Sequence, residues 1–116
     1  MDTLDLLKQP AEQRYSYLIN QIKKNHQLWI LADDVGAVMF NSDHEDCIAV
    51  WSEEALAKLW CTDDWQHCQP LAITKDKWIN DWLPGLQEDE VAILIMPDLN
   101  DEGLVIESWE MAERLS

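Results

Sequence analysis

Residues 91–96 read VAILIM, an uninterrupted apolar run in a chain of 116 residues that carries 23 acidic side chains. Such a run is typical of a strand buried on both faces, because a half-exposed strand alternates apolar and polar side chains. Turn-forming residues follow at 98–103, and residues 104–106 (LVI) then have the composition of a second strand. The run therefore predicts a buried strand that opens a C-terminal hairpin.

Three more strands are predicted upstream of this run. Residues 28–31 (LWIL), 37–40 (AVMF) and 47–51 (CIAVW) are apolar segments separated by polar, turn-forming residues. Because short connections favour antiparallel neighbours, we expect a three-stranded meander. Residues 70–73 are expected to form a further short extended segment.

Helices are predicted between and around these strands. Pro10 suits the start of a first helix, whose apolar face is formed by Tyr15, Leu18, Ile19 and Ile22 at helical spacing. This helix is expected to end at 25–26. The last helix is expected over 109–115, after a capping serine at 108.

Two further helices are expected in the middle of the chain. Ser52 is a candidate N-cap for a helix through 55–60, and Thr74 is a candidate N-cap for a helix carrying Trp78 and Trp82. Pro84 followed by a glycine is expected to end the latter. The order αβββαβαββα has no repeating βαβ unit. It predicts an α+β domain over residues 1–116, with a mainly antiparallel sheet, packed helices and 1–9 as a loosely ordered arm.

Charge is distributed unevenly along the chain, whose formal net charge is −15. Residues 1–25 hold three acids against four bases, a net of +1, whereas residues 26–116 hold 20 acids against four bases, a net of −16. Such a field repels nucleic acid and anionic membrane surfaces, and it attracts a cationic protein. Acidity that only keeps the domain soluble is the plain alternative.

Targeting signals and cysteine pairing point to one compartment. No apolar run approaches the ~18 residues of a membrane span, and the N-terminal segment lacks the pattern of a secretory signal. Three cysteines are an odd number and do not make a disulfide framework. We therefore expect a cytoplasmic protein.

Several fragments, taken in order, resemble a known family. They are Arg14-Tyr15-x-Tyr17, Leu28-Trp29-x-Leu31, Ala49-Val50-Trp51, Pro70-x-x-Ile73, Trp82-Leu83-Pro84-Gly85-Leu86 and Gly103-x-Val105. The chain is similar, from about Arg14 to Leu115, to small bacterial proteins grouped as domain of unknown function 2750. Ala49 departs from the proline that is usual there. The resemblance implies one soluble domain and carries no activity, cofactor or functional residue.

Metal sites are weakly supported by spacing. Zinc prefers about four nitrogen or sulfur ligands from paired motifs, and the available residues are His44, Cys47, Cys61, His67 and Cys68. Only His44 and Cys47 have a usable spacing, so we expect no zinc site. Residues 98–103 superficially match a calcium loop, but Trp109 stands where the bidentate glutamate belongs, so a hairpin turn is favoured. No cofactor is expected.

Catalytic motifs are also missing from the sequence. The acidic pairs fall in turns and at helix ends, where water screens them, and catalytic carboxylates require burial or close pairing. Three glycines in the whole chain leave little room for a phosphate-binding loop. We therefore expect no enzyme, with an unrecognised cleft enzyme or ligand-binding domain as one alternative.

The seven tryptophans divide into core and surface candidates. Trp60, Trp78 and Trp82 lie on apolar helix faces and are expected in the core, whereas Trp109 is not assigned to either group. The candidate partner-binding residues combine exposed indoles with adjacent acids: Trp65, Asp63, Asp64, Trp29, Trp51, Asp33 and Asp34. The expected function is a non-enzymatic binding module for a basic protein, of the toxin-neutralising or charge-mimic type. A homo-oligomerising structural domain is the other alternative.

Overall fold

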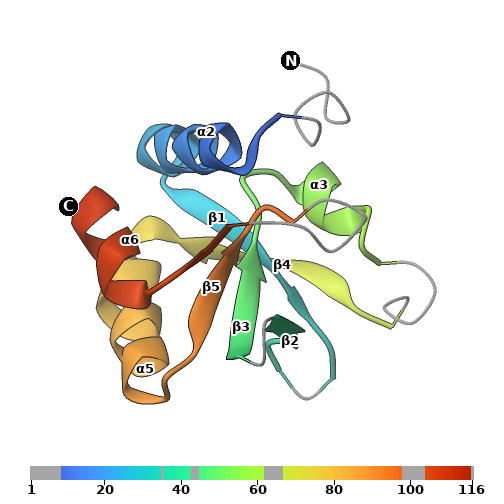
Figure 1. Cartoon of the computed structure of the whole chain (residues 1–116). Helices are drawn as coiled ribbons and strands as arrows, with labels where there is room; N and C mark the ends of the chain where they lie inside the picture. Colours follow the sequence, from blue (N-terminus) through green and yellow to red (C-terminus); the bar gives the residue numbers. More distant parts are fainter. Residues whose placement is uncertain (1–8, 35, 43–44, 62–66, 98–103, 116) are drawn as a thin grey trace.

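The helices and strands form an α+β fold, seen in a computed structural model that describes residues 9–34, 36–42, 45–61, 67–97 and 104–115 (Figure 1). The strands are β1 (Gln27–Ala32), β2 (Met39–Ser42), β3 (Glu45–Val50), β4 (Gln69–Thr74), β5 (Ala92–Ile95) and β6 (Leu104–Ile106). The helices are α2 (Ala11–Asn25), α3 (Glu54–Lys58), α4 (Lys75–Lys77), the π-helical η2 (Trp78–Trp82), α5 (Leu83–Glu88) and α6 (Ser108–Leu115).

β5 is an inner strand of a four-stranded sheet with the order β2-β3-β5-β6. All of its residues are buried, as the apolar run predicts. It pairs antiparallel with β6, which confirms the C-terminal hairpin, and parallel with β3. The parallel pair was not expected. It requires the long connection through α3, β4 and the following helices, because parallel strands cannot be joined by a tight turn.

The predicted three-stranded meander is wrong. β1 pairs antiparallel with β4 along its whole length, from Gln27 opposite Thr74 to Ala32 opposite Gln69. The bridge between Ala32 and Ala37 joins the end of β1 to the segment before β2. Pairing with all six residues of β4 satisfies the backbone groups on one edge of β1, and β2 pairs with β3. β1 meets the larger sheet where Trp29 and Trp51 exchange two backbone hydrogen bonds of 2.9 Å.

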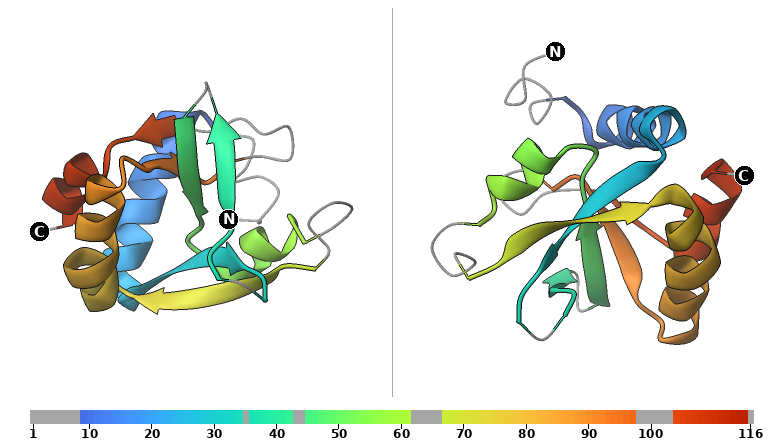
Figure 2. Two further views of the ribbon diagram at one scale, coloured as in Figure 1. Left: turned by 90° about the horizontal axis from the view of Figure 1, so that it is seen from below. Right: turned by 180° about the vertical axis from the view of Figure 1, so that it is seen from behind.

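The helices cover the sheets from three sides. α2 packs on β1, β5 and β6, with the predicted apolar face buried, and it ends at Asn25, where His26 adopts a left-handed φ of 60°. α5 and α6 lie side by side on one flank (Figure 1), and the two views of Figure 2 show α3 on the opposite side, beside β4. Within the described ranges, no helix combines the length and apolarity that a membrane span requires.

The helix after β4 does not end at Pro84, contrary to prediction. Helical structure is continuous over residues 75–88, which we call the composite helix. Its middle turn is π-helical, and the Leu83 N–H donates to the Trp78 carbonyl five residues earlier. In a regular α-helix the Pro84 ring would clash with the carbonyl of Asn80. The extra residue in the π-turn widens the helix just before the proline. The Pro84 ring is therefore accommodated and the helix continues beyond it.

The predicted division of the tryptophans is confirmed for two of the three core candidates. Trp60 and Trp78 are buried, while Trp82 is only half-buried and stacks on Trp78 with centroids 6.0 Å apart. Trp109 is 52% exposed. Ser108, expected as a cap, is instead the first residue of α6, and the Glu107 carbonyl accepts from the Glu110 and Met111 amides.

Two predicted N-caps differ in the structure, and this difference is testable. The Thr74 hydroxyl accepts from the Lys77 amide at 3.3 Å, whereas Ser52 makes no cap bond, and its buried hydroxyl has no hydrogen-bond partner among the described residues. We expect Thr74→Ala to lower the free energy of unfolding by about 1 kcal/mol. Ser52→Ala should leave it unchanged or raise it, because an unsatisfied buried hydroxyl is removed. Urea unfolding of both variants measures this, and equal losses would contradict the assignment.

Candidate functional site

The predicted surface residues do not form one site. Trp65, Asp63 and Asp64 lie outside the described residues. Trp51 is fully buried at the end of β3, with its ring centroid 6.2 Å from that of Trp60, so it is excluded as a surface contact. Its backbone is paired with that of Trp29, and its ring is part of the hydrophobic core.

Three of the predicted residues lie on β1 or just after it. Trp29 and Asp33 are half-buried, and Asp34 is exposed. Asp33 shapes the local turn, where one carboxylate oxygen accepts from the Gly36 amide at 3.1 Å. Its other oxygen lies 3.9 Å from His67 Nε2, across the end where β1 and β4 meet.

Cys68 lies close to this aspartate, and Cys61 lies close to Cys68. Burial is the main cause that raises the pKa of the Cys68 thiol, and the nearby charges of Asp33 and Cys61 raise it further. Burial also raises the pKa of Cys61, against the opposing charge of Lys58. Both thiols are therefore held in the protonated form, which is the opposite of what a nucleophilic cysteine requires. Among the described residues no three histidine, cysteine or acidic side chains are grouped so as to hold a metal ion. His44 and residues 98–103 lie outside them.

The raised thiol pKa values predict slow alkylation at neutral pH. A folded-state pKa above the ordinary 9.0 means that the folded protein keeps its proton where the unfolded chain loses it. We expect iodoacetamide to label native protein slowly at pH 7 and much faster above pH 9.0, with half-buried Cys61 labelled first. Cys61→Ser should remove most of this labelling, because Cys47 and Cys68 are buried. Rapid labelling at pH 7 would contradict this. Because both thiol pKa values are raised in the folded protein, the folded state also loses stability as the pH rises through these pKa values.

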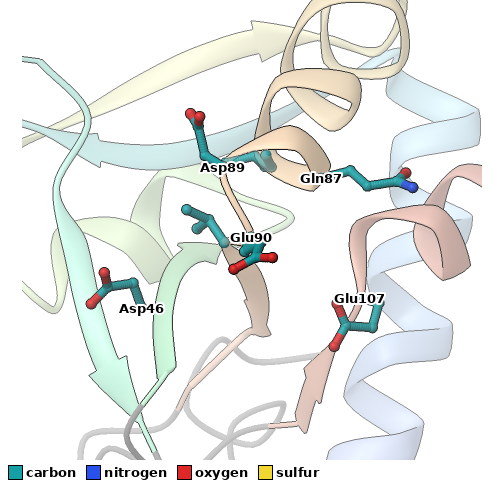
Figure 3. A pocket seen from close by; sticks show the side chains of 7 residues that line it. Asp46, Gln87, Asp89, Glu90 and Glu107 are labelled. Carbon is teal, nitrogen blue, oxygen red and sulfur yellow. The ribbon is translucent and has the colours of Figure 1, made fainter.

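An acidic pocket lies at one end of the larger sheet. The cavity has a volume of about 550 Å³ and is lined by Asp46, Leu86, Gln87, Asp89, Glu90, Val91 and Glu107. Four of these residues are carboxylates, none is a base, and all four acids are exposed. Figure 3 shows Glu90 between Asp46 and Glu107, while Asp89 and Gln87 turn outward at the rim.

Sheet topology brings these acids together. β3 and β5 are parallel and in register from Cys47 opposite Ala92, so Asp46 near the start of β3 and Glu90 just before β5 lie at the same end of the sheet. β6 runs the opposite way, with Ile106 opposite Ile93, and therefore delivers Glu107 to the same end. The sequence places Asp46, Glu90 and Glu107 far apart, and no spacing rule connects them.

The turn after α5 positions Glu90. The Val91 amide donates to the Leu86 carbonyl at 2.8 Å and the Glu90 amide to the Gln87 carbonyl at 3.2 Å, the pattern of a Schellman C-cap. The left-handed residue of this motif is usually glycine, but here Glu90 occupies it with a φ of 60°. The chain thus accepts a backbone strain of about 1 kcal/mol at the residue that lies inside the pocket.

The pocket suits a cationic organic group better than a metal ion. Its carboxylates are spread around a wide opening, without the close oxygen cluster that calcium or magnesium requires. An ammonium or guanidinium group can instead be attracted by several separated carboxylates at once. Because the acids are exposed, the strength of this attraction depends on salt.

Comparison with known proteins gives one match. A family model described as a protein of unknown function, DUF2750, matches residues 15–115. No curated protein and no solved structure matches the chain. The matched segment extends from α2 to the end of α6 and includes every residue that lines the acidic pocket. The chain therefore belongs to the DUF2750 family of proteins of unknown function.

Proposed function

We propose that this domain is a non-enzymatic binding module that engages a cationic segment of a protein partner through the acidic pocket. The single observation that carries the proposal is the composition of the pocket wall, in which Asp46, Asp89, Glu90 and Glu107 face no lining base. Repulsion among such carboxylates is relieved when a lysine or arginine side chain enters, which gives the pocket a preference for basic partners.

The charge of the whole chain supports the same proposal. A net charge of −15 creates a negative field that accelerates encounter with a basic protein and repels nucleic acid. The strain accepted at Glu90 is a second support, because strained backbone is concentrated at functional positions. A glycine there would relieve the strain but would remove a carboxylate from the pocket.

An enzymatic role is less well supported. Catalytic acids and bases require burial or close pairing to shift their pKa, whereas the pocket carboxylates are exposed. Near Asp33 the His67 and Cys68 side chains come closest to a catalytic arrangement, but burial favours the protonated thiol there. Both groups of residues therefore suit binding or structure better than chemistry.

The test compares two charge-matched double variants. Glu90→Gly with Glu107→Gln removes two charges from the pocket, and Asp76→Asn with Asp81→Asn removes two from the exposed side of the composite helix. The probe is an acetylated, amidated hexa-arginine peptide, titrated by calorimetry at low and at physiological salt. The pocket variant should bind about three- to tenfold more weakly than wild type, and the helix variant much less so. Salt should weaken wild-type binding.

Stability measurements separate lost binding from lost fold. The pocket variant should be at least as stable as wild type, because glycine relieves the left-handed strain at position 90. Equal weakening by both double variants would mean that only diffuse charge attracts the peptide, and the pocket proposal would fail. Binding that is indifferent to salt, or no binding at all, would reject the proposal outright.

A further inference from the structure

A second cavity runs beside β6. Its volume is about 460 Å³, and its walls come from the first half of α2 (Glu12, Tyr15, Ser16), from β6 (Leu104, Val105, Ile106) and from α6 (Glu110, Arg114). Consecutive strand residues point to opposite faces of a sheet. A cavity lined by all three β6 residues therefore follows the edge of the strand and not one face. We call it the edge groove.

The edge of β6 that borders the groove has unpaired backbone. In the described part of the chain β6 has a ladder partner only in β5, on its other side. In an antiparallel ladder the N–H and C=O of one residue point to the same neighbour, and the next residue points the other way. At least one β6 residue therefore directs both groups toward the groove, which is the template for an added strand.

A buried phenol adds a second, independent feature. Tyr15 lines the groove, is only 5% exposed, and its hydroxyl has no hydrogen-bond partner among the described residues. Burial is the main cause that raises its pKa, the Glu110 charge raises it further, and Arg114 opposes both. The hydroxyl therefore stays a neutral donor. Arg114 lies over the ring, with Cζ 4.6 Å from the centroid. The ring and the guanidinium together form one wall of the groove.

From these observations we propose that the edge groove binds an extended peptide segment, which joins the larger sheet as a strand beside β6. The segment's main chain pairs with the open edge of β6, beside the Tyr15 and Arg114 side chains that line the groove. This mode of recognition draws its affinity from backbone bonds and its specificity from alternate side chains. The groove volume lies within the range of ligand sites.

Charge identifies the segment as basic. Glu12 and Glu110 line the groove against the single cation Arg114, which already stacks on Tyr15. Glu107, which follows β6 directly, belongs to the acidic pocket. A strand bound along β6 would therefore extend from the edge groove toward the acidic pocket, and its lysine or arginine side chains could pair with carboxylates in both cavities. The inference rests on the proposed function, since it takes the same cationic partner and adds how its main chain is held.

The experiment uses three hexapeptides and the full chain labelled with ¹⁵N. The first is acetylated, amidated Lys-Val-Lys-Val-Lys-Val, the second has glutamate in place of lysine, and the third is the lysine peptide with N-methyl groups on its four central residues. The lysine peptide should shift the amide signals of residues 104–106, and the glutamate peptide should not. N-methylation keeps the charge but blocks backbone pairing, so affinity should fall about tenfold or more.

Variants locate the site independently of the peptide. Ser16→Arg fills the groove and should abolish the shifts at 104–106, whereas Asn20→Arg, one turn further along the exposed side of α2, has the same charge change and should bind nearly as wild type.

Two outcomes overturn the inference, and they differ in what else they reject. If the lysine peptide shifts only residues 89–91 and 107, and N-methylation has no effect, the strand proposal is wrong while the acidic pocket stands. If neither the lysine peptide nor the hexa-arginine peptide binds at any salt concentration, both proposals are rejected.

Discussion

Replacing Trp78 by alanine is expected to lower the free energy of unfolding by about 3–5 kcal/mol. The indole is fully buried, its Nε1–H donates to the Met111 sulfur at 3.3 Å, and its ring stacks on Trp82. Truncation leaves a large cavity and removes the hydrogen bond that links the composite helix to Met111 of α6. Urea unfolding followed by circular dichroism measures the loss.

Two other tryptophans serve as controls for this result. Trp109→Ala removes an indole that is 52% exposed and should cost less than about 1 kcal/mol. Trp82→Ala should fall between the two, because that ring is only half-buried. If Trp109→Ala destabilised the protein as much as Trp78→Ala, the burial assigned to these rings would be wrong.

Replacing Arg14 by alanine is expected to cost about 2–4 kcal/mol. The side chain is only 4% exposed, and its Nη1 donates to the Met96 carbonyl at 3.1 Å, joining α2 to the end of β5. Met96 has a φ of 39°, and its amide donates to the Val50 carbonyl at 2.9 Å. Arg14 therefore holds a strained turn at the point where β5 leaves the sheet. Unfolding should be measured at high salt, so that the lost positive charge contributes little.

Arg14→Met separates packing from hydrogen bonding. Methionine keeps most of the apolar stem and removes the donor, so about 1–3 kcal/mol of the loss should remain. Lys24→Met, an exposed change of equal charge on the same helix, should be close to neutral. An Arg14→Met protein as stable as wild type would show that the bond to Met96 contributes nothing.

Local features of the fold were predictable because they depend on neighbouring residues. The face of α2 follows from helical spacing, and β5 and its hairpin follow from an apolar run and turn-forming residues. Strand pairing was not predictable, because β1 pairs with β4 across an intervening hairpin and helix, and no local pattern in either strand identifies its partner. The continuation of the helix past Pro84 was not predicted either, because it depends on the π-turn that accommodates the proline ring.

The acidic pocket could not be predicted for the same reason. Asp89 and Glu90 are visible in the sequence as part of an acidic turn, but Asp46 and Glu107 join them only through the parallel pairing of β3 with β5 and the return of β6. The edge groove likewise depends on α2, β6 and α6 meeting at one strand edge. The one available signal was the excess of acids after residue 25, which indicates a cationic partner and no location.

The pairing of β3 with β5 has a consequence for how the chain folds during synthesis. β1 can pair with β4, and β3 with β5, only after some 40 further residues have been synthesised. Until then the emerging chain can form α2, the β2–β3 hairpin and the isolated bridges that join β1 to Ala37 and Trp51. Such distant contacts slow folding, because the loop must close before the contacts stabilise it. Apolar strand edges in the early half of the chain therefore stay open during this interval, and the excess of acids over bases in residues 26–61 opposes association between such chains by charge repulsion.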